Sequence, residues 1–204
     1  MLRRDAVIAF VLVCSWLVPA VASAGTYEID PAHTSVQFSV RHMMISNVRG
    51  EFTKVSGKAT GDPATPLATV VEATIDAASV DTRNEKRDEH LRSPDFLDAA
   101  KFPTITFKST KIEAAGDGKW KLAGDLTLHG VTKPVVLDVG NVTPPTKDPW
   151  GNARIGAEAT TTINRQDFGV SYNKTLDGGG VLVGDQIAIT IDVEVVMKAD
   201  AAAK

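Results

Sequence analysis

The sequence contains few residue patterns that could carry out catalysis. Its four histidines share no H-x-H or H-E-x-x-H spacing, so their order along the chain does not define a zinc site. The one cysteine, Cys14, lies in an N-terminal apolar run, and the sequence has no G-x-S-x-G nucleophile motif. The run Gly178-Gly179-Gly180 lacks the lysine and the helix of a phosphate-binding loop. We therefore expect no enzyme and no resident metal or cofactor; a site assembled in space by distant residues is the alternative.

Three polar residues are the candidates for contacting the polar part of a ligand. His42 follows Phe38 and Val40 at every second position, so an alternating strand would turn all three toward one face. A buried polar group needs a partner, which is either a ligand head group or a nearby carboxylate or backbone group. Arg87 and His90 lie in a charged stretch. Arg87 would pair there with an acidic head group, or fix a helix in place through local ion pairs.

The elements that must position these residues are mostly strands. Apolar residues recur at every second position after Gly25, which is typical of strands with one buried face. The clearest segments are 35–42 and 187–195, and alternation also predicts strands around 48–52, 71–75, 105–107, 122–128, 135–139 and 155–163. Glycine- and proline-containing turn signals separate these segments. The pattern predicts one all-β domain.

Residues 82–100 depart from this alternation. Helix-forming residues dominate from Glu85 to Arg92, and Ser93-Pro94 should end a helix there. Phe96 and Phe102 follow as apolar side chains suited to closing the mouth of a β structure. We expect one or two short helices that cap one end of the domain.

Strands with one apolar face bury it in a two-sheet sandwich or in a closed barrel, and alternation leaves both open. The inward faces mix large residues with small ones, among them Gly50, Ala73, Gly124 and Ala157. Small inward residues either make room for a large neighbour or leave a cavity. An eight-stranded barrel is accordingly filled by side chains or holds one small ligand.

The N-terminus has the three parts of a secretory signal. Arg3 and Arg4 precede an apolar run over 6–17, and Ala22-Ser23-Ala24 forms a small-residue exit. A membrane anchor is the alternative, but the run is shorter than the roughly 20 residues of a spanning helix. We expect cleavage between Ala24 and Gly25, a periplasmic location and no stable membrane insertion afterwards. The domain would then cover residues 25–198, before a disordered tail at 199–204.

Several motifs together resemble the YceI-like family, in that family's order and across residues 27–196. The first is YEIDPAHTS at 27–35 with the alternating residues up to His42, followed by Gly50-Glu51-Phe52. The most specific is RDEHLRSPDFLDAAKFPTITFKS at 87–109. GDLTLHGVTKP at 124–134 and RQDFG at 165–169 complete the set.

The resemblance implies an eight-stranded antiparallel lipocalin-like barrel with an elongated apolar cavity. It also implies a periplasmic binding or carrier protein for a long isoprenoid lipid of the polyprenyl phosphate or quinone type. Other hydrophobic amphiphiles, such as fatty amides or antibiotics bound during stress, are the alternative, because an apolar tunnel discriminates poorly among them. The formal net charge of −3 argues against a nucleic-acid partner, and a homodimer stays open.

Within such a barrel, strand parity predicts which apolar residues line the cavity. The expected lining residues are Phe38, Val40, Phe52, Ile75, Phe107, Leu126 and Leu128, with Phe96 and Phe102 at the mouth. His42, Arg87 and His90 are the expected head-group contacts, each with a structural role as the alternative.

Overall fold

The computed structural model describes residues 25–197. The expected signal peptide, 1–24, and the expected tail, 199–204, lie outside the described residues. The strands are β1 (Gly25–Ile29), β2 (Ser35–His42), β3 (Ser46–Phe52), β4 (Val55–Gly61), β5 (Val70–Asp76), β6 (Val80–Asp81), β7 (Thr104–Gly116), β8 (Lys119–Leu128), β9 (Val131–Gly140), β10 (Thr146–Lys147), β11 (Ala153–Asn164) and β12 (Val183–Met197). The described residues also form one α-helix, α1 (Glu85–Arg92), and three 3-10 helices: η1 (Pro66–Ala68), η2 (Ala77–Ser79) and η3 (Arg165–Phe168).

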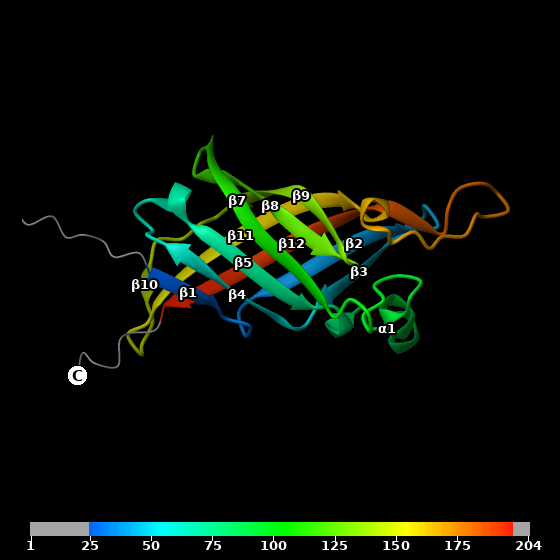
Figure 1. Cartoon of the computed structure of the whole chain (residues 1–204), viewed down its shortest axis with the longest axis horizontal. Helices are drawn as coiled ribbons and strands as arrows, with labels where there is room; N and C mark the ends of the chain where they lie inside the picture. The colour runs from blue at the N-terminus through cyan, green and yellow to red at the C-terminus, as the bar shows by residue number, and fades with distance from the viewer. Residues whose placement is uncertain (1–24, 198–204) are drawn as a thin grey trace, which may run out of the picture.

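Eight of these strands close into a barrel (Figure 1). The ring runs β12-β11-β9-β8-β7-β5-β4-β1 and returns to β12, and each pairing in it is antiparallel. β2 pairs with β12 farther along the same edge that β1 uses, and it carries β3 and β6 with it. The predicted eight-stranded antiparallel barrel is confirmed, and the sandwich alternative is wrong.

The ring includes two strands that alternation did not predict. β1 and β4 have the sequences GTYEI and VSGKATG, in which few large apolar residues mark the inward face. They pair with each other over Gly25–Glu28 and Lys58–Gly61, and β4 pairs with β5 from Val55 to Thr60. Backbone pairing therefore completes the wall where the side-chain pattern is weak.

A cap covers one end of the barrel. α1 spans the predicted residues. It begins where the Asn84 side chain accepts a hydrogen bond from the Arg87 amide, and it ends where Ser93 adopts an extended backbone conformation. Arg92 then ties the helix to the wall, because its guanidinium donates to the carbonyl oxygens of Ala78 and Val80 at 2.7 and 2.8 Å. Figure 1 shows α1 and the loop after η3 at the same end of the molecule.

Two inward glycines make room for aromatic rings. A Cβ on Gly50 would lie 2.6 Å from the ring of Phe38, its partner across β2 and β3. A Cβ on Gly124 would lie 2.4 Å from the ring of Phe107. Glycine at these positions therefore leaves the space that the two phenylalanine rings occupy.

Candidate ligand-binding cavity

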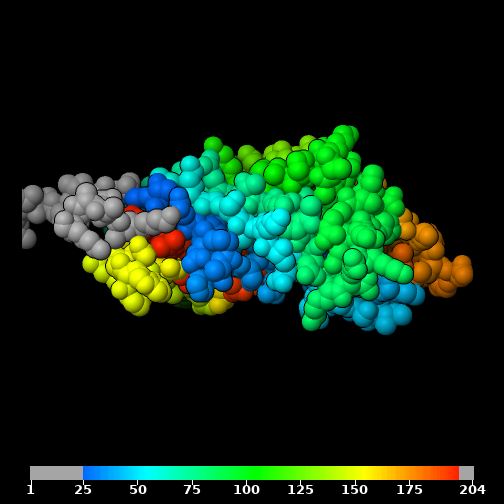
Figure 2. All heavy atoms as spheres, turned by 90° about the horizontal axis from the view of Figure 1, so that it is seen from below, coloured from blue at the N-terminus to red at the C-terminus, as the bar shows by residue number. Residues whose placement is uncertain are grey.

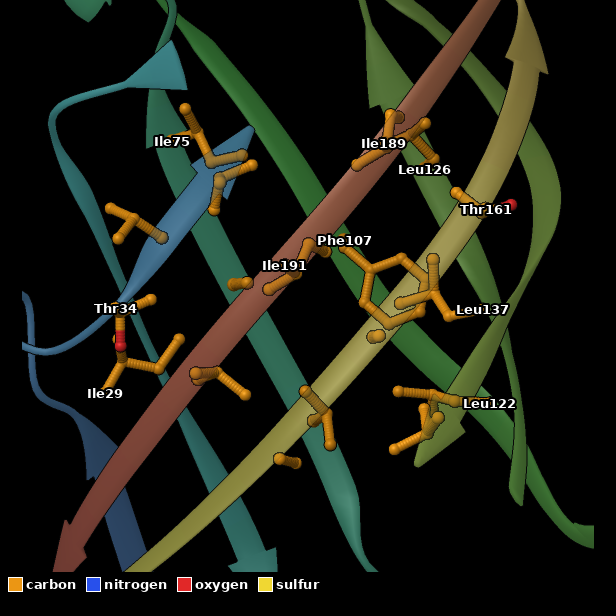
Figure 3. A pocket seen from close by; sticks show the side chains of 18 of the residues that line it. Ile29, Thr34, Ile75, Phe107, Leu122, Leu126, Leu137, Thr161, Ile189 and Ile191 are labelled. Atoms are coloured by element: carbon orange, nitrogen blue, oxygen red, sulfur yellow. The ribbon is translucent and has the colours of Figure 1, made fainter. Parts of the chain in front are cut away.

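The barrel encloses a cavity of about 850 Å³. This volume lies in the upper part of the range of about 300–1,000 Å³ that is typical of small-molecule sites. In Figure 3, Phe107, Leu122, Leu126, Leu137, Ile189 and Ile191 project from β7, β8, β9 and β12 toward a shared space. Along β12, alternate residues from Ile187 to Val195 line the cavity, which corresponds to a length of roughly 26 Å at about 3.3 Å per residue. The cavity is thus elongated as well as apolar.

Most of the predicted lining residues lie on the cavity wall. These are Phe38, Val40, Phe52, Ile75, Phe107, Leu126 and Leu128, together with Phe96 at one end. Parity places them correctly because each strand is half-buried and regular where they occur. Their contact with a ligand stays a prediction.

The predicted place of Phe102 at the mouth is wrong. Its ring packs edge-on against the ring of His129, with centroids 4.7 Å apart, and lies over Gly130. The His129–Gly130 turn after β8 has positive φ at both residues, and the missing side chain at Gly130 creates the seat for Phe102. Phe102 therefore packs outside the cavity lining, at the turn between β8 and β9.

Sequence reasoning missed most of the wall. β9, β11 and β12 contribute Leu137, Val139, Ile155, Ala157, Ala159, Ile187, Ile189 and Ile191, all on faces that alternation had marked as apolar. The signal was therefore present, but parity alone does not say which apolar positions face open space. Pro63, Pro144 and Pro145, which sequence reasoning had read only as turn signals, also line the cavity, as does Pro66 of η1.

Several polar groups on the cavity wall, among them Thr34, Thr161 and Arg165, are hydrogen-bonded to the protein. The Thr161 hydroxyl donates to the Val136 carbonyl oxygen at 2.8 Å, and the Thr34 hydroxyl accepts from the Glu194 amide at 3.2 Å. Arg165 is 3% exposed and donates to the carbonyl oxygens of Gly184, Val170, Tyr172 and Val183 and to the Asp185 carboxylate. Burial lowers the pKa of Arg165, and the charge of Asp185 opposes that shift. The interior therefore presents an apolar surface.

The two ends of the cavity differ in exposure. At the α1 end the lining residues Val80, Phe96, Arg165 and Val170 are buried. At the other end the lining residues Pro63, Gly118 and 142–145 are exposed. The cavity is closed beneath α1 and opens between the β4–β5 loop, the β7–β8 turn and the segment after β9; we call this the open end.

The predicted head-group residues do not line the cavity. His42 is the last residue of β2, where it pairs with Val183 and Ser46; Val183 lines the cavity, but His42 does not. Arg87 donates to the Thr82 hydroxyl at 2.7 Å and to the Thr82 carbonyl at 2.8 Å, so it fixes the start of α1.

His90 lies in an outer layer over the cap. Its Nε2 lies 2.8 Å from the Asp95 carboxylate, and its ring contacts Phe96 and Tyr172 edge-on, each at 5.0 Å between centroids. The structural alternative therefore describes Arg87 and His90 better than head-group contact. Leu91 and Leu97 join Phe96 in closing the cavity end.

An ion-pair network braces the open end. Arg154 donates to Asp30 at 2.7 Å, to Asp148 at 2.9 Å and to Glu194. Hydrogen bonds from Arg154, His33 and the Ala32 amide lower the pKa of Asp30 to about 2. Burial raises the pKa of Asp148, but hydrogen bonds from Arg154, Asn152 and two backbone amides outweigh it and hold that pKa at about 2.

Among the described residues, Asp30, His33 and Glu194 also have the spacing of a metal-ligating group, with their ligand atoms within 4.8 Å of one another. The Arg154 guanidinium contacts both carboxylates of this group, so it supplies the positive charge that a cation would bring. The geometry is that of an ion-pair network. Within residues 25–197, no helix has both the length and the apolar character needed to cross a membrane.

Comparison with known proteins gives one family match. The model of the YceI-like domain matches residues 27–195. A UPF0312 protein of Vibrio cholerae is 42% identical over 155 residues, which cover 75% of this chain and 82% of that protein. A UPF0312 protein of Ectopseudomonas mendocina is 42% identical over 170 residues, covering 82% and 88% of the two chains.

Solved structures share the fold. The Campylobacter jejuni YCEI protein has a TM-score of 0.65 at 36% identity, over 78% of this chain and 90% of that one. Burkholderia cenocepacia BcnA has a TM-score of 0.71 at 26% identity, over 81% and 98%. A polyisoprenoid binding domain from Saccharophagus degradans, at 15% identity and a TM-score of 0.62, shares the fold alone.

Proposed function

Because the chain belongs to the YceI-like domain family, we propose that it binds a long isoprenoid lipid, of the polyprenyl phosphate or quinone type, in its barrel cavity. The elongated and mostly apolar cavity, in which Thr161 and Arg165 are bonded to the protein, is the observation that carries this proposal. A chain-like ligand gains about 0.8 kcal/mol per buried methylene without any specific contact. The protein described as a polyisoprenoid binding domain supports the same ligand class at the level of the fold.

The lipid enters tail first in this proposal. The α1 end is closed by Phe96, Leu97 and the fully bonded Arg165, so it offers an apolar seat and no partner for a phosphate or a quinone oxygen. The open end leaves the polar head near water. The protein would act in the periplasm as a carrier or reservoir, with capture of other hydrophobic amphiphiles as the second role, because the wall selects mainly for length and apolar character.

The test combines extraction of the native protein with a blocked cavity. Protein purified from its own host is extracted with organic solvent, and mass spectrometry identifies the lipid; we expect a near-stoichiometric isoprenoid. Ala157 is half-buried on the wall, so Ala157→Phe should place a ring across the cavity and lower the lipid content about tenfold or more. Thr160→Phe, at an exposed position of the same strand, is the control and should keep the lipid. A lipid-free extract from the wild type, or equal lipid in both variants, would contradict the proposal.

A further inference from the structure

Exposed apolar side chains flank the open end of the cavity. Leu67 and Val70, from η1 and the start of β5, are 57% and 44% exposed. Across the mouth, Val142 and Trp150 are 45% and 78% exposed. Apolar groups gathered on one surface can mark an interaction site, so this rim is a candidate docking surface.

Trp150 is held outward by a preformed turn between β10 and β11. The Asp148 carboxylate accepts hydrogen bonds from the Trp150 and Asn152 amides, each at 2.9 Å, and from the Asn152 side chain. Arg154 pairs with the same carboxylate, whose side chain is only 5% exposed. The turn therefore hides its own carboxylate and presents Pro149 and Trp150. Figure 2 shows this segment, in yellow, at the end of the molecule opposite the orange loop.

The rim is continuous with the cavity wall. Pro63 and Pro66 line the mouth next to Leu67, and Pro144 and Pro145 line it between Val142 and the Trp150 turn. A lipid tail moving across this rim would stay against apolar groups from the outside to the interior. A surface with this shape fits a partner that itself supplies lipid.

We propose that the open end docks onto the surface of a lipid bilayer, with Trp150 as the anchor at the interface. The proposal rests on lipid binding in the cavity, which gives the docked position its use. Tryptophan favours the boundary between apolar and polar membrane regions, because its ring is apolar and its N–H is polar. Docking through apolar contacts should depend little on salt, unlike attraction between a basic patch and anionic lipids.

The opposite end supplies a matched control. The β2–β3 turn presents Met44 at 55% exposure and Ile45 at 74%, and the value for Ile45 is close to the 78% of Trp150. This turn lies beyond the closed end, where the buried Arg165 and Phe96 separate it from the cavity. An apolar contact without a route to the cavity should add little to the uptake of lipid.

The experiment measures co-sedimentation of the full mature protein with phosphatidylcholine vesicles. Trp150→Asp should lower the bound fraction about tenfold, and Leu67→Asp should lower it less, while Ile45→Asp should leave it nearly unchanged. Raising the salt concentration should not release the wild type. Thermal unfolding checks that each variant folds. We expect all three to fold, because the three positions are exposed.

The outcomes separate docking from cargo binding. Loading from detergent micelles tests the cavity without a bilayer, and Trp150→Asp should load as much isoprenoid as the wild type. If the wild type does not load from micelles, the proposed function fails, and sedimentation still decides the docking proposal. Equal loss of vesicle binding in Ile45→Asp and Trp150→Asp, or no loss in either, would overturn docking at the open end. A Trp150-dependent dimer that ignores vesicles would likewise overturn it.

Discussion

Arg165 at the closed end and Arg154 at the open end each make several hydrogen bonds, but the two guanidinium groups have different partners. Arg165, at the α1 end, is 3% exposed and donates to four carbonyl oxygens and to Asp185. Arg154, at the open end, is half-buried and pairs with the carboxylates of Asp30, Asp148 and Glu194. The closed end is therefore held mainly by hydrogen bonds from Arg165 to backbone carbonyl oxygens, and the open end by ion pairs near the surface.

This difference suits a barrel that must stay shut at one end and open at the other. Carbonyl oxygens keep their dipoles at every pH, so the loop after η3 stays attached to Arg165 and the closed end remains apolar inside. Ion pairs near the surface are weaker and respond to salt and acid. The ion pairs of Arg154 stabilise the rim without blocking the mouth of the cavity.

The largest expected effect is at Arg165. Arg165→Met would leave several buried carbonyl oxygens without their donor, and each such group costs about 1–3 kcal/mol. We expect the free energy of unfolding to fall by more than about 4 kcal/mol, measured by urea denaturation. Arg154→Met is the matched variant and should lose clearly less. Equal losses in the two variants would remove the contrast between the ends.

A smaller effect is expected for the side chain that closes the cavity. Phe96 is 9% exposed and packs against His90 and Tyr172, so Phe96→Ala should cost about 3 kcal/mol. It should also open the closed end to water and speed the release of a fluorescent lipid, followed by stopped-flow mixing with acceptor vesicles. Trp120→Ala, at a half-buried position near the mouth, is the control and should change release less. Faster release from the Trp120 variant than from the Phe96 variant would contradict the assignment of the closed end to Phe96.

The smallest effect is expected on acidification of the open end. The pKa values of Asp30 and Asp148 fall from an ordinary 3.8 to about 2, so their contribution to stability is complete above about pH 4. It should be lost as the pH falls toward 2, because the unfolded chain binds these protons first. Melting temperatures across this interval should fall less steeply for Arg154→Met than for the wild type. Parallel curves would show that Arg154 does not set the acid response.

The elements with a regular local sequence pattern were predicted most accurately. The strand at 35–42 and the helix at 85–92 were predicted to the residue, because strict alternation marks β2, and a run of helix-forming residues that stops at Ser93-Pro94 marks α1. β1 and β4 were missed, since β1 has only five residues and the inward positions of β4 after Val55 are small. Parity found lining residues on regular strands, but it also placed His42 on the lining face, and His42 does not line the cavity. Phe102 was misplaced because the open seat over Gly130 arises only when the β8–β9 turn folds.

The sequence by itself determined the all-β class, the capping helix and the apolar faces, because each follows from neighbours within a few positions. Only the tertiary structure decided that the wall closes, that Gly50 and Gly124 clear space for two phenylalanines, and that one end is sealed and the other open. Those properties join residues far apart in the chain, as Arg165 joins the loop that follows it to the start of β12. A cavity forms only where several strands face one another, so the sequence of a single strand does not reveal it.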